Sequence, residues 1–229
     1  ALHAHIDLGV GSVEYLERVI VQADATGFRA RIHLKIDTGL HRNGLSAEEW
    51  GDGVRIALDA QHCGMIDLVG AWSHLAEASD AEDDAAQARF LAAVTRAETL
   101  GARLPYQHLT ASAATWERPE LRGTLVRVGA FCFGVRSADG PDLPGIAPAA
   151  ELVAPVRRIE HDEVVIGAGS FDGLPSTLAR RVRVGTPGGA RELRSGGIDE
   201  MRVEAWEGAS VGDEVVVFGR GRCGEESPT

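Results

Sequence analysis

The spacing of hydrophobic residues changes at about residue 134 and divides this chain into two parts. Up to about residue 134, segments with apolar residues at helical spacing alternate with shorter segments in which apolar and polar residues alternate singly, as in strands. The pattern predicts helices over 12–27, 46–61 and 81–101, strands over 30–36, 65–72 and 106–109, and a further apolar segment over 125–133. Strands and helices in alternation are typical of a parallel α/β barrel or an open parallel sheet.

The second part has many glycines and no long helical segment. Short alternating segments predict strands over 183–185, 201–206 and 214–218, as expected of an all-β domain. The predicted fold class is therefore α/β, with a partial barrel over residues 11–146 and a β domain over 147–229. We assign the short strand within residues 1–10 to the β domain.

Residues with chemical potential stand just after the predicted strands. Arg42 follows the first strand, His74 the second and Ser112 the third. The carboxyl ends of parallel strands lie at one edge of a sheet, and in barrels the active site lies at that edge. We expect these three side chains to belong to one site.

Composition narrows the classes of function. A net charge of −11 without a basic cluster argues against a nucleic-acid-binding surface. No run approaches the ~20 apolar residues of a membrane span, and the first residues lack the basic stretch of a signal peptide. The cysteines are odd in number and have no metal-ligand spacing, which indicates reduced thiols and a cytoplasmic location; they are Cys63, Cys132 and Cys223.

Lys35 is the only lysine among 23 basic residues. Unlike a guanidinium, its amine can lose a proton and become a nucleophile. The alternative is a structural lysine with a buried alkyl stem and a solvated head. In the predicted strand Lys35 points to the same side as His33.

Five segments resemble sequence motifs of the fold-type III, pyridoxal-phosphate-dependent alanine racemases. They occur in the order found in that family: HLKIDTGLHRNG (33–44), GAWSHLA (70–76), HLTASAA (108–114), RVGAFCFG (127–134) and GGIDEM (196–201). Each match alone is weak, but five in order are specific. The resemblance implies a TIM-type (β/α)8 barrel, partial in this chain, that binds pyridoxal 5'-phosphate, and a C-terminal all-β domain.

The resemblance also implies roles for cofactor-binding residues. Arg127 would face the pyridine nitrogen, where a group that only donates keeps that nitrogen unprotonated. His74 would pack against the ring. The phosphate would be held by Ser112 and by backbone N–H groups around Gly129 and Ala130. The structural alternatives are an ion pair for Arg127, a core or loop histidine for His74 and a helix cap for Ser112.

Three residues correspond to catalytic positions of the family. Arg42 would lie near the substrate carboxylate, and Lys35 matches a position that can be carbamylated, where the resulting anion would orient Arg42. Asp199 and the backbone of Ile198 match a motif that meets the substrate from the partner subunit, which implies a homodimer with shared active sites. The alternative for Asp199 is a turn carboxylate.

The chain departs from the family at two essential positions. The lysine that forms a Schiff base with the cofactor and the catalytic tyrosine are both missing, because the context of Lys35 is different and neither Tyr15 nor Tyr106 matches the tyrosine motif. We therefore expect missing residues at 10–11 and near 163–164. The closing stretch also stops before the last region of the family motif pattern.

The function that this resemblance implies is interconversion of L-alanine and D-alanine, a small amino-acid substrate, which in bacteria supplies D-alanine for peptidoglycan. The activity of these 229 residues by themselves is in doubt. The first alternative is a non-catalytic, racemase-like homologue. A second is a metal hydrolase that uses His33, His41, His74 and His108, although no pair has metal-ligand spacing with a carboxylate, so we predict no metal site.

Overall fold

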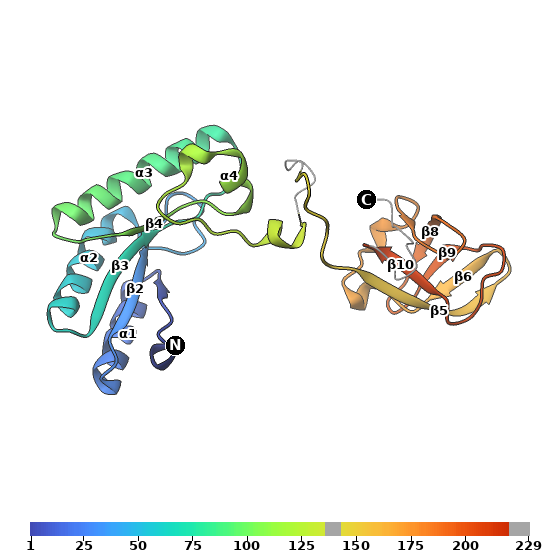
Figure 1. Ribbon diagram of the computed structural model, residues 1–229, viewed down its shortest axis with the longest axis horizontal. Coiled ribbons are helices and arrows are strands. Elements are labelled where there is room, and N and C mark those ends of the chain that lie inside the picture. Colours follow the sequence, from blue (N-terminus) through green and yellow to red (C-terminus); the bar gives the residue numbers. More distant parts are fainter. Residues whose placement is uncertain (136–142, 220–229) are drawn as a thin grey trace. The chain divides into compact units, whose positions relative to one another are not determined.

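Four parallel strands lie side by side in chain order in the first part of the protein (Figure 1). We describe residues 1–135 and 143–219 of the computed structural model, which divides into two units, Ala1–Pro144 and Gly145–Thr229. The strands of the first unit are β1 (Leu8–Val10), β2 (Ala30–Lys35), β3 (Ile66–Trp72) and β4 (Tyr106–His108). Each pairs in parallel with the next, so the carboxyl ends of all four lie at one edge.

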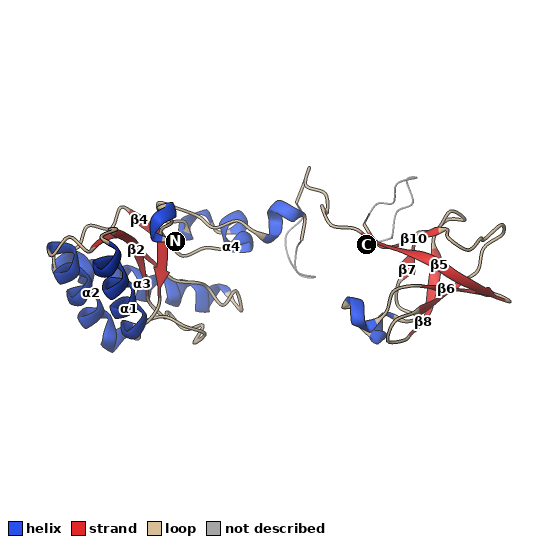
Figure 2. Ribbon diagram, turned by 90° about the horizontal axis from the view of Figure 1, so that it is seen from below, coloured by secondary structure: helices blue, strands red, loops and turns tan. Residues whose placement is uncertain are grey.

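Helices connect these strands and cover one face of the sheet (Figures 1 and 2). They are α1 (Val13–Thr26), α2 (Ala47–His62) and α3 (Asp80–Thr99), and a short α4 (Ser112–Glu117) follows β4. The core forms where strand residues such as Ile32 and Ile66 meet Leu16, Val54 and Phe90 of the three long helices. The opposite face of β2 presents Arg31 and His33, which are only partly buried.

Local signals explain where the helices begin. Ser12 caps α1 by accepting a hydrogen bond from the Tyr15 N–H. Ser46 and Glu49 form a capping box at the start of α2, in which each side chain bonds the backbone N–H of the other. The helices and strands predicted in this unit are confirmed to within about two residues at most ends.

Two predictions for the first unit are wrong. The strand within residues 1–10 does not belong to the β domain, because β1 pairs with β2 and α1 connects the two directly. The apolar segment 125–133 does not continue the alternation of strands and helices. Its first residues form only scattered backbone bonds beside β4, such as Leu125 N–H to Gln107 O, and Ala130–Phe133 form a 3₁₀-helix.

The second unit is an antiparallel β barrel. Its strands are β5 (Leu152–Glu160), β6 (Glu163–Ile166), β7 (Arg183–Val184), β8 (Arg191–Gly196), β9 (Met201–Glu204) and β10 (Glu214–Phe218). They pair in the order β10-β5-β6-β9-β8-β7, and a bridge between Gly185 and Val216 joins the two ends. The barrel encloses an apolar core around Val164, Leu193 and Val203. The predicted all-β domain is confirmed, and its boundary lies two residues before the predicted one.

Regular structure surrounds both places where we expected missing residues. Gly11 alone separates β1 from Ser12, the cap of α1. Glu163 and Val164 are successive residues of β6 that pair with Glu204 and Val203 of β9. The expectation that residues of the family are missing at these two places stays a prediction.

Gly70 in β3 makes room for the polar face of the sheet, and replacing it tests this arrangement. A Cβ atom there would lie 2.3 Å from His33 Nδ1 and 2.7 Å from the Tyr106 carbonyl oxygen. We expect Gly70→Ala to lower the free energy of unfolding by roughly 1–3 kcal/mol, because the strands or the histidine must move. Gly11→Ala is the control, since its Cβ would meet its nearest neighbour at 3.4 Å, an ordinary contact. Urea denaturation that finds both variants equally stable would contradict this packing.

Candidate active site at the carboxyl ends of the strands

Arg127 is the centre of a polar cluster at the carboxyl ends of β3 and β4. Its Nη2 donates to the carbonyl oxygens of Ser73 (2.8 Å) and Leu109 (3.0 Å) and lies 3.0 Å from His74 Nδ1. Its Nη1 lies 2.8 Å from His108 Nδ1. A guanidinium has donors only. His108 must therefore accept at Nδ1 and carry its proton on Nε2, and His74 Nδ1 can accept only by sharing a hydrogen of Nη2 with one of the two carbonyl oxygens.

The position of the proton on His108 sets the direction of the hydrogen bonds that lead from Arg127 to Asp7. His108 Nε2 lies 3.1 Å from His33 Nδ1, and His33 Nε2 lies 3.2 Å from Asp7 Oδ2. Because His108 must donate from Nε2, His33 accepts at Nδ1 and donates to Asp7. Arg31 completes the chain with two further bonds to the Asp7 carboxylate, at 2.7 and 3.2 Å. Two cations thus stand at the ends of one continuous network.

The two histidines around Arg127 are neutral at physiological pH. Burial lowers the pKa of His74 to about 4, and the positive charges of Arg127, Arg42 and Lys35 act in the same direction. Burial, with Arg127 and His33, also lowers the pKa of His108 to about 4. Neutral imidazoles can accept hydrogen bonds from Arg127, which protonated ones cannot. The electrostatics therefore agree with the tautomers that the geometry demands.

Lys35, the last residue of β2, is buried beside this cluster with 2% of its surface exposed. Its ammonium donates to Asn43 Oδ1 and lies 4.6 Å from the centre of the Trp72 ring, a cation–π contact. Burial lowers the pKa of Lys35, and repulsion by Arg42 and Arg127 lowers it further. The alternative expectation for Lys35, a buried stem with a solvated head, is therefore wrong.

The expected contact between Lys35 and Arg42 is not formed with the unmodified lysine. Arg42 lies on the exposed loop after β2, close enough to lower the pKa of Lys35 and His74. It forms no hydrogen bond or ion pair with the described residues. Asn43, the next residue, takes the place beside the ammonium. Carbamylation of Lys35 stays a prediction.

Ser112 and Gly129 lie together on another side of the site. The Gly129 N–H donates to Ser112 Oγ at 3.1 Å, and Ser112 itself is largely buried. A Cβ at Gly129 would meet nothing within 4 Å, so open space faces this backbone. Ala130 follows as an exposed residue. Ser112 and Gly129 are thus in contact, and the binding of a phosphate by these residues and Ala130 stays a prediction.

Asp199 lies in the second unit, in the turn between β8 and β9. Its side chain is exposed, and its carbonyl oxygen accepts from Arg157 Nη1 at 3.3 Å. The neighbouring Ile198 carbonyl accepts from the Phe171 N–H at 2.9 Å. The contact of Asp199 with substrate stays a prediction.

Sequence reasoning missed three residues of this site, Asp7, Asn43 and Trp72, and it named His108 only as a candidate metal ligand. Trp72 stacks on His108 and also lies 5.2 Å from the Arg127 guanidinium carbon. A signal was present for His108 and Trp72, because each lies at the carboxyl end of a predicted strand. Asp7 and Asn43 gave no such signal, since their roles depend on strand order and on the path of a loop.

The described residues contain neither a membrane-spanning helix nor a group of side chains placed to bind a metal ion. None of their helices combines the length and the apolar character that crossing a bilayer requires. Within residues 1–135 and 143–219, no group of three His, Cys, Asp or Glu side chains is arranged to hold a metal ion.

The buried neutral histidines predict a loss of stability in mild acid. An unfolded histidine titrates near 6.5, whereas His74 and His108 have a folded pKa of about 4. The unfolded chain therefore binds more protons between these values, and the free energy of unfolding falls as pH drops from 6.5 to 4. For His108 the loss reaches up to about 3 kcal/mol at ~1.4 kcal/mol per pKa unit.

Urea denaturation at a series of pH values measures this loss. His108→Gln keeps an acceptor for Arg127 but does not titrate, so its stability should fall less steeply with pH. His62→Gln, at an exposed position on α2, should behave as the parent chain. A parent-like slope in His108→Gln would show that this imidazole is not held neutral.

Proteins similar to this chain in sequence are named alanine racemases. The family model described as "Alanine racemase, N-terminal domain" matches residues 1–137. The alanine racemase of Beutenbergia cavernae is 38% identical over 256 residues, covering 98% of this chain and 67% of that protein. The alanine racemase of Thermobifida fusca is 31% identical over 250 residues, with 98% and 67% covered.

Solved structures of the same enzyme are similar in fold. The alanine racemase of Streptomyces coelicolor A3(2) matches with a TM-score of 0.89 and 28% identity, over 99% of this chain and 66% of that one. The enzyme from D-cycloserine-producing Streptomyces lavendulae matches with a TM-score of 0.86 and 29% identity, over 96% and 64%. These similarities confirm the predicted fold class of a partial α/β barrel with a β domain.

The comparisons also show what this chain lacks. It spans about two thirds of the length of these relatives. The alignment with the Beutenbergia cavernae protein covers 256 residues, more than the 229 of this chain. That relative therefore contains residues inside the matched region that have no counterpart here. On the family match over residues 1–137, the identity to named relatives and the shared fold, this chain belongs to the alanine racemase family.

Proposed function

We propose that this chain carries the cofactor-facing part of a pyridoxal-phosphate-dependent amino-acid racemase that interconverts L-alanine and D-alanine. The observation that carries the proposal is the arrangement of Arg127 between two neutral imidazoles. Two carbonyl oxygens and two imidazoles hold the guanidinium in place, and its Nε–H has no hydrogen-bond partner among the described residues. The names of the relatives support the same activity.

The residues present fit pyridoxal phosphate. Ser112 Oγ accepts from the Gly129 N–H and can donate its own proton to a phosphate beside open backbone. His74 is uncharged and can pack against an aromatic ring. Trp72 Nε1 is a buried donor without a partner in the described residues, so the site retains unused hydrogen-bonding capacity. When bound, the cofactor supplies a conjugated ring that accepts the electron pair left by removal of the α-proton.

Arg127 would set the character of that chemistry. As a donor, it would leave the pyridine nitrogen unprotonated and so weaken the ring as an electron sink. A weaker sink suits a racemase, which must return the proton quickly, better than a transaminase. The cations Lys35, Arg42 and Arg127 would attract the substrate carboxylate. Lys35 would act as a positioning group, and Arg42 would orient the substrate.

A non-catalytic member of the family is the second candidate, and one observation favours it. The only lysine donates to Asn43 and lies against Trp72, and both tyrosines lie elsewhere, Tyr15 on α1 and Tyr106 at the start of β4. The groups that bond the cofactor and move the proton in the family are therefore absent from these 229 residues. By itself the chain would hold the cofactor without converting alanine.

The same proposal covers partners and location. A homodimer would allow Asp199 and the Ile198 backbone of one subunit to meet the substrate bound by the other. The exposed free thiols of Cys63 and Cys132 suit a reducing, cytoplasmic setting. The product, D-alanine, would serve as a precursor of peptidoglycan.

Cofactor binding by the purified chain tests the proposal. We expect pyridoxal phosphate to bind with pyridoxal, which lacks the phosphate, binding more weakly. Ser112→Ala should weaken pyridoxal phosphate by roughly tenfold, the effect of losing one charge-assisted hydrogen bond, and should leave pyridoxal unchanged. Ser176→Ala, an exposed serine of the second unit, is the control. Equal binding of both compounds would contradict the phosphate site.

Two further measurements separate the candidates. Conversion of L-alanine to D-alanine by the chain would support the racemase and exclude the non-catalytic homologue. Borohydride reduction followed by mass spectrometry shows whether any residue bonds the cofactor. A label on Lys35 would overturn its assignment as a positioning group. Binding with neither turnover nor label would support the second candidate.

A further inference from the structure

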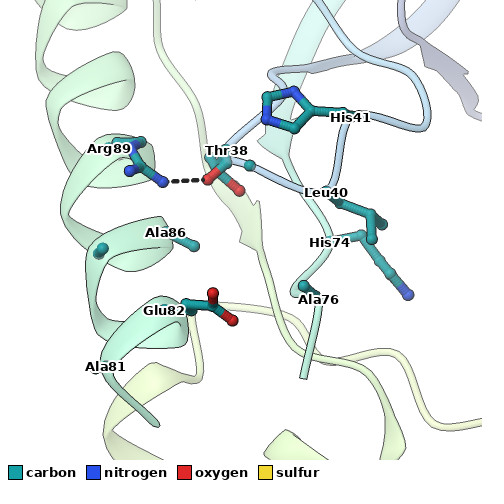
Figure 3. A pocket seen from close by; sticks show the side chains of 11 residues that line it. Thr38, Leu40, His41, His74, Ala76, Ala81, Glu82, Ala86 and Arg89 are labelled. Carbon is teal, nitrogen blue, oxygen red and sulfur yellow. Dashed lines mark hydrogen bonds between the residues drawn. The ribbon is translucent and has the colours of Figure 1, made fainter. Parts of the chain in front are cut away.

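A cavity lies beside the proposed cofactor site, on the side of α3. It has a volume of about 430 Å³ and is lined by the loop after β2, the residues after β3 and one face of α3 (Figure 3). Four alanines form much of its wall and leave space between the longer side chains: Ala76, Ala81, Ala85 and Ala86. His74 also lines it, and the same imidazole is bonded to Arg127. The cavity therefore adjoins the proposed site through one shared residue.

Two opposite charges of α3 face this cavity. Arg89 and Glu82 lie on the same face of the helix and extend toward the loops opposite (Figure 3). Seven residues correspond to about two turns, or roughly 10 Å along the axis. The two side chains do not form an ion pair with each other. In the described part of the chain, the Glu82 carboxylate has no hydrogen-bond or ion-pair partner at all.

Arg89 is held in a defined position. Its Nη1 donates to the Thr38 carbonyl oxygen at 2.8 Å. A Cβ at Gly39, whose φ of +130° suits glycine, would lie 3.1 Å from the same nitrogen. The loop is fixed in turn by Asp37, whose Oδ1 accepts from the N–H groups of Gly39 (3.0 Å) and His41 (3.1 Å). One bond to Thr38 leaves the other donors of the guanidinium available.

The chemistry of a ligand follows from this pair of charges. An anion alone would pair with Arg89 and leave Glu82 without a partner, and a cation alone would pair only with Glu82. A zwitterion satisfies both, because its carboxylate can accept from Arg89 while its ammonium donates to Glu82. The seven-residue spacing puts the two positions roughly 10 Å apart along the helix axis, and both long side chains can turn toward one α-amino acid and form charge-assisted bonds of ~2.8 Å with it.

We propose that this cavity is a holding site for a free α-amino acid, with Arg89 binding the carboxylate and Glu82 the ammonium group. The inference rests on the proposed function for its biological meaning, since a racemase would benefit from a site that collects its substrate or product beside the cofactor. The site recognises charge and not handedness, so L-alanine and D-alanine are both ligands. Binding there needs no cofactor.

Titration of the cofactor-free chain with alanine, followed by NMR or calorimetry, tests the proposal. L-alanine and D-alanine should bind with similar affinity. Propionate, which lacks the ammonium group, and alanine amide, which lacks the carboxylate, should bind at least roughly tenfold more weakly. Propionate binding as well as alanine would overturn the proposal, because an anion site would then suffice.

Variants assign the site to its residues. Glu82→Gln and Arg89→Gln should each weaken alanine binding by roughly tenfold or more, and Arg89→Lys should retain part of it. Arg96→Gln and Glu98→Gln, at exposed positions farther along α3, are the matched controls. Circular dichroism confirms that each variant is folded. Unchanged alanine binding in folded Glu82→Gln and Arg89→Gln would place the ligand elsewhere and refute the site.

The two proposals fail separately. Pyridoxal phosphate binding should be the same in Glu82→Gln as in the parent chain. Alanine binding that depends on Arg89 together with absent cofactor binding would sustain the cavity and refute the cofactor site. Cofactor binding without alanine binding in the cofactor-free chain would do the reverse.

Discussion

A guanidinium that can only donate hydrogen bonds determines the organisation of the first unit. Arg127 needs acceptors on every side, and the strand ends supply them as two carbonyl oxygens and two imidazole nitrogens. An imidazole that accepts from Arg127 must then place its proton on the far nitrogen. For His108 this choice passes through His33 to Asp7, the residue just before β1. The position of one side chain thereby constrains three strands, because β4 holds His108, β2 holds His33 and Arg31, and Asp7 directly precedes β1.

The site also concentrates positive charge in a protein with a net charge of −11. Lys35, Arg42 and Arg127 lie close enough to act on the same histidine, whose pKa they help to lower. Burying cations together is unfavourable unless something compensates. The Trp72 ring faces both Lys35 and Arg127, and backbone carbonyls take up part of the remaining charge. An anionic ligand would complete the compensation, which explains how a site rich in cations is consistent with an acidic chain.

Much of the fold followed from the sequence because its signals are local. The Ser46 capping box and the alternation of Ile32 and Leu34 with Arg31 and His33 are decided within a few residues. The errors concern long-range choices. Whether the short strand at Leu8–Val10 joins one sheet or the other depends on which edge is available, and Leu125–Phe133 is apolar without having a strand partner. β5 was missed because Pro155 interrupts the usual strand pattern.

The candidate site shows the same division. Lys35, His74, Ser112 and Arg127 stand at strand ends or in motifs and were named from the sequence. Their actual partners were not, since the contact of Lys35 with Asn43 depends on the path of a loop, and that of Gly129 with Ser112 on packing across 17 residues of chain. The roles implied for Arg42 and Asp199 depend on a bound substrate and a partner subunit. These roles stay predictions.

The solitary lysine gives this protein a built-in reporter. Amine-directed reagents normally mark many surface positions, but here Lys35 is the only side chain that can react, and 2% of its surface is exposed. Its modification therefore requires that the amine first become accessible and leave its contacts with Asn43 and Trp72. The rate of labelling at that amine would measure how often the pocket around Lys35 opens. No engineered probe is needed, because no other side chain carries an amine that would add to the signal.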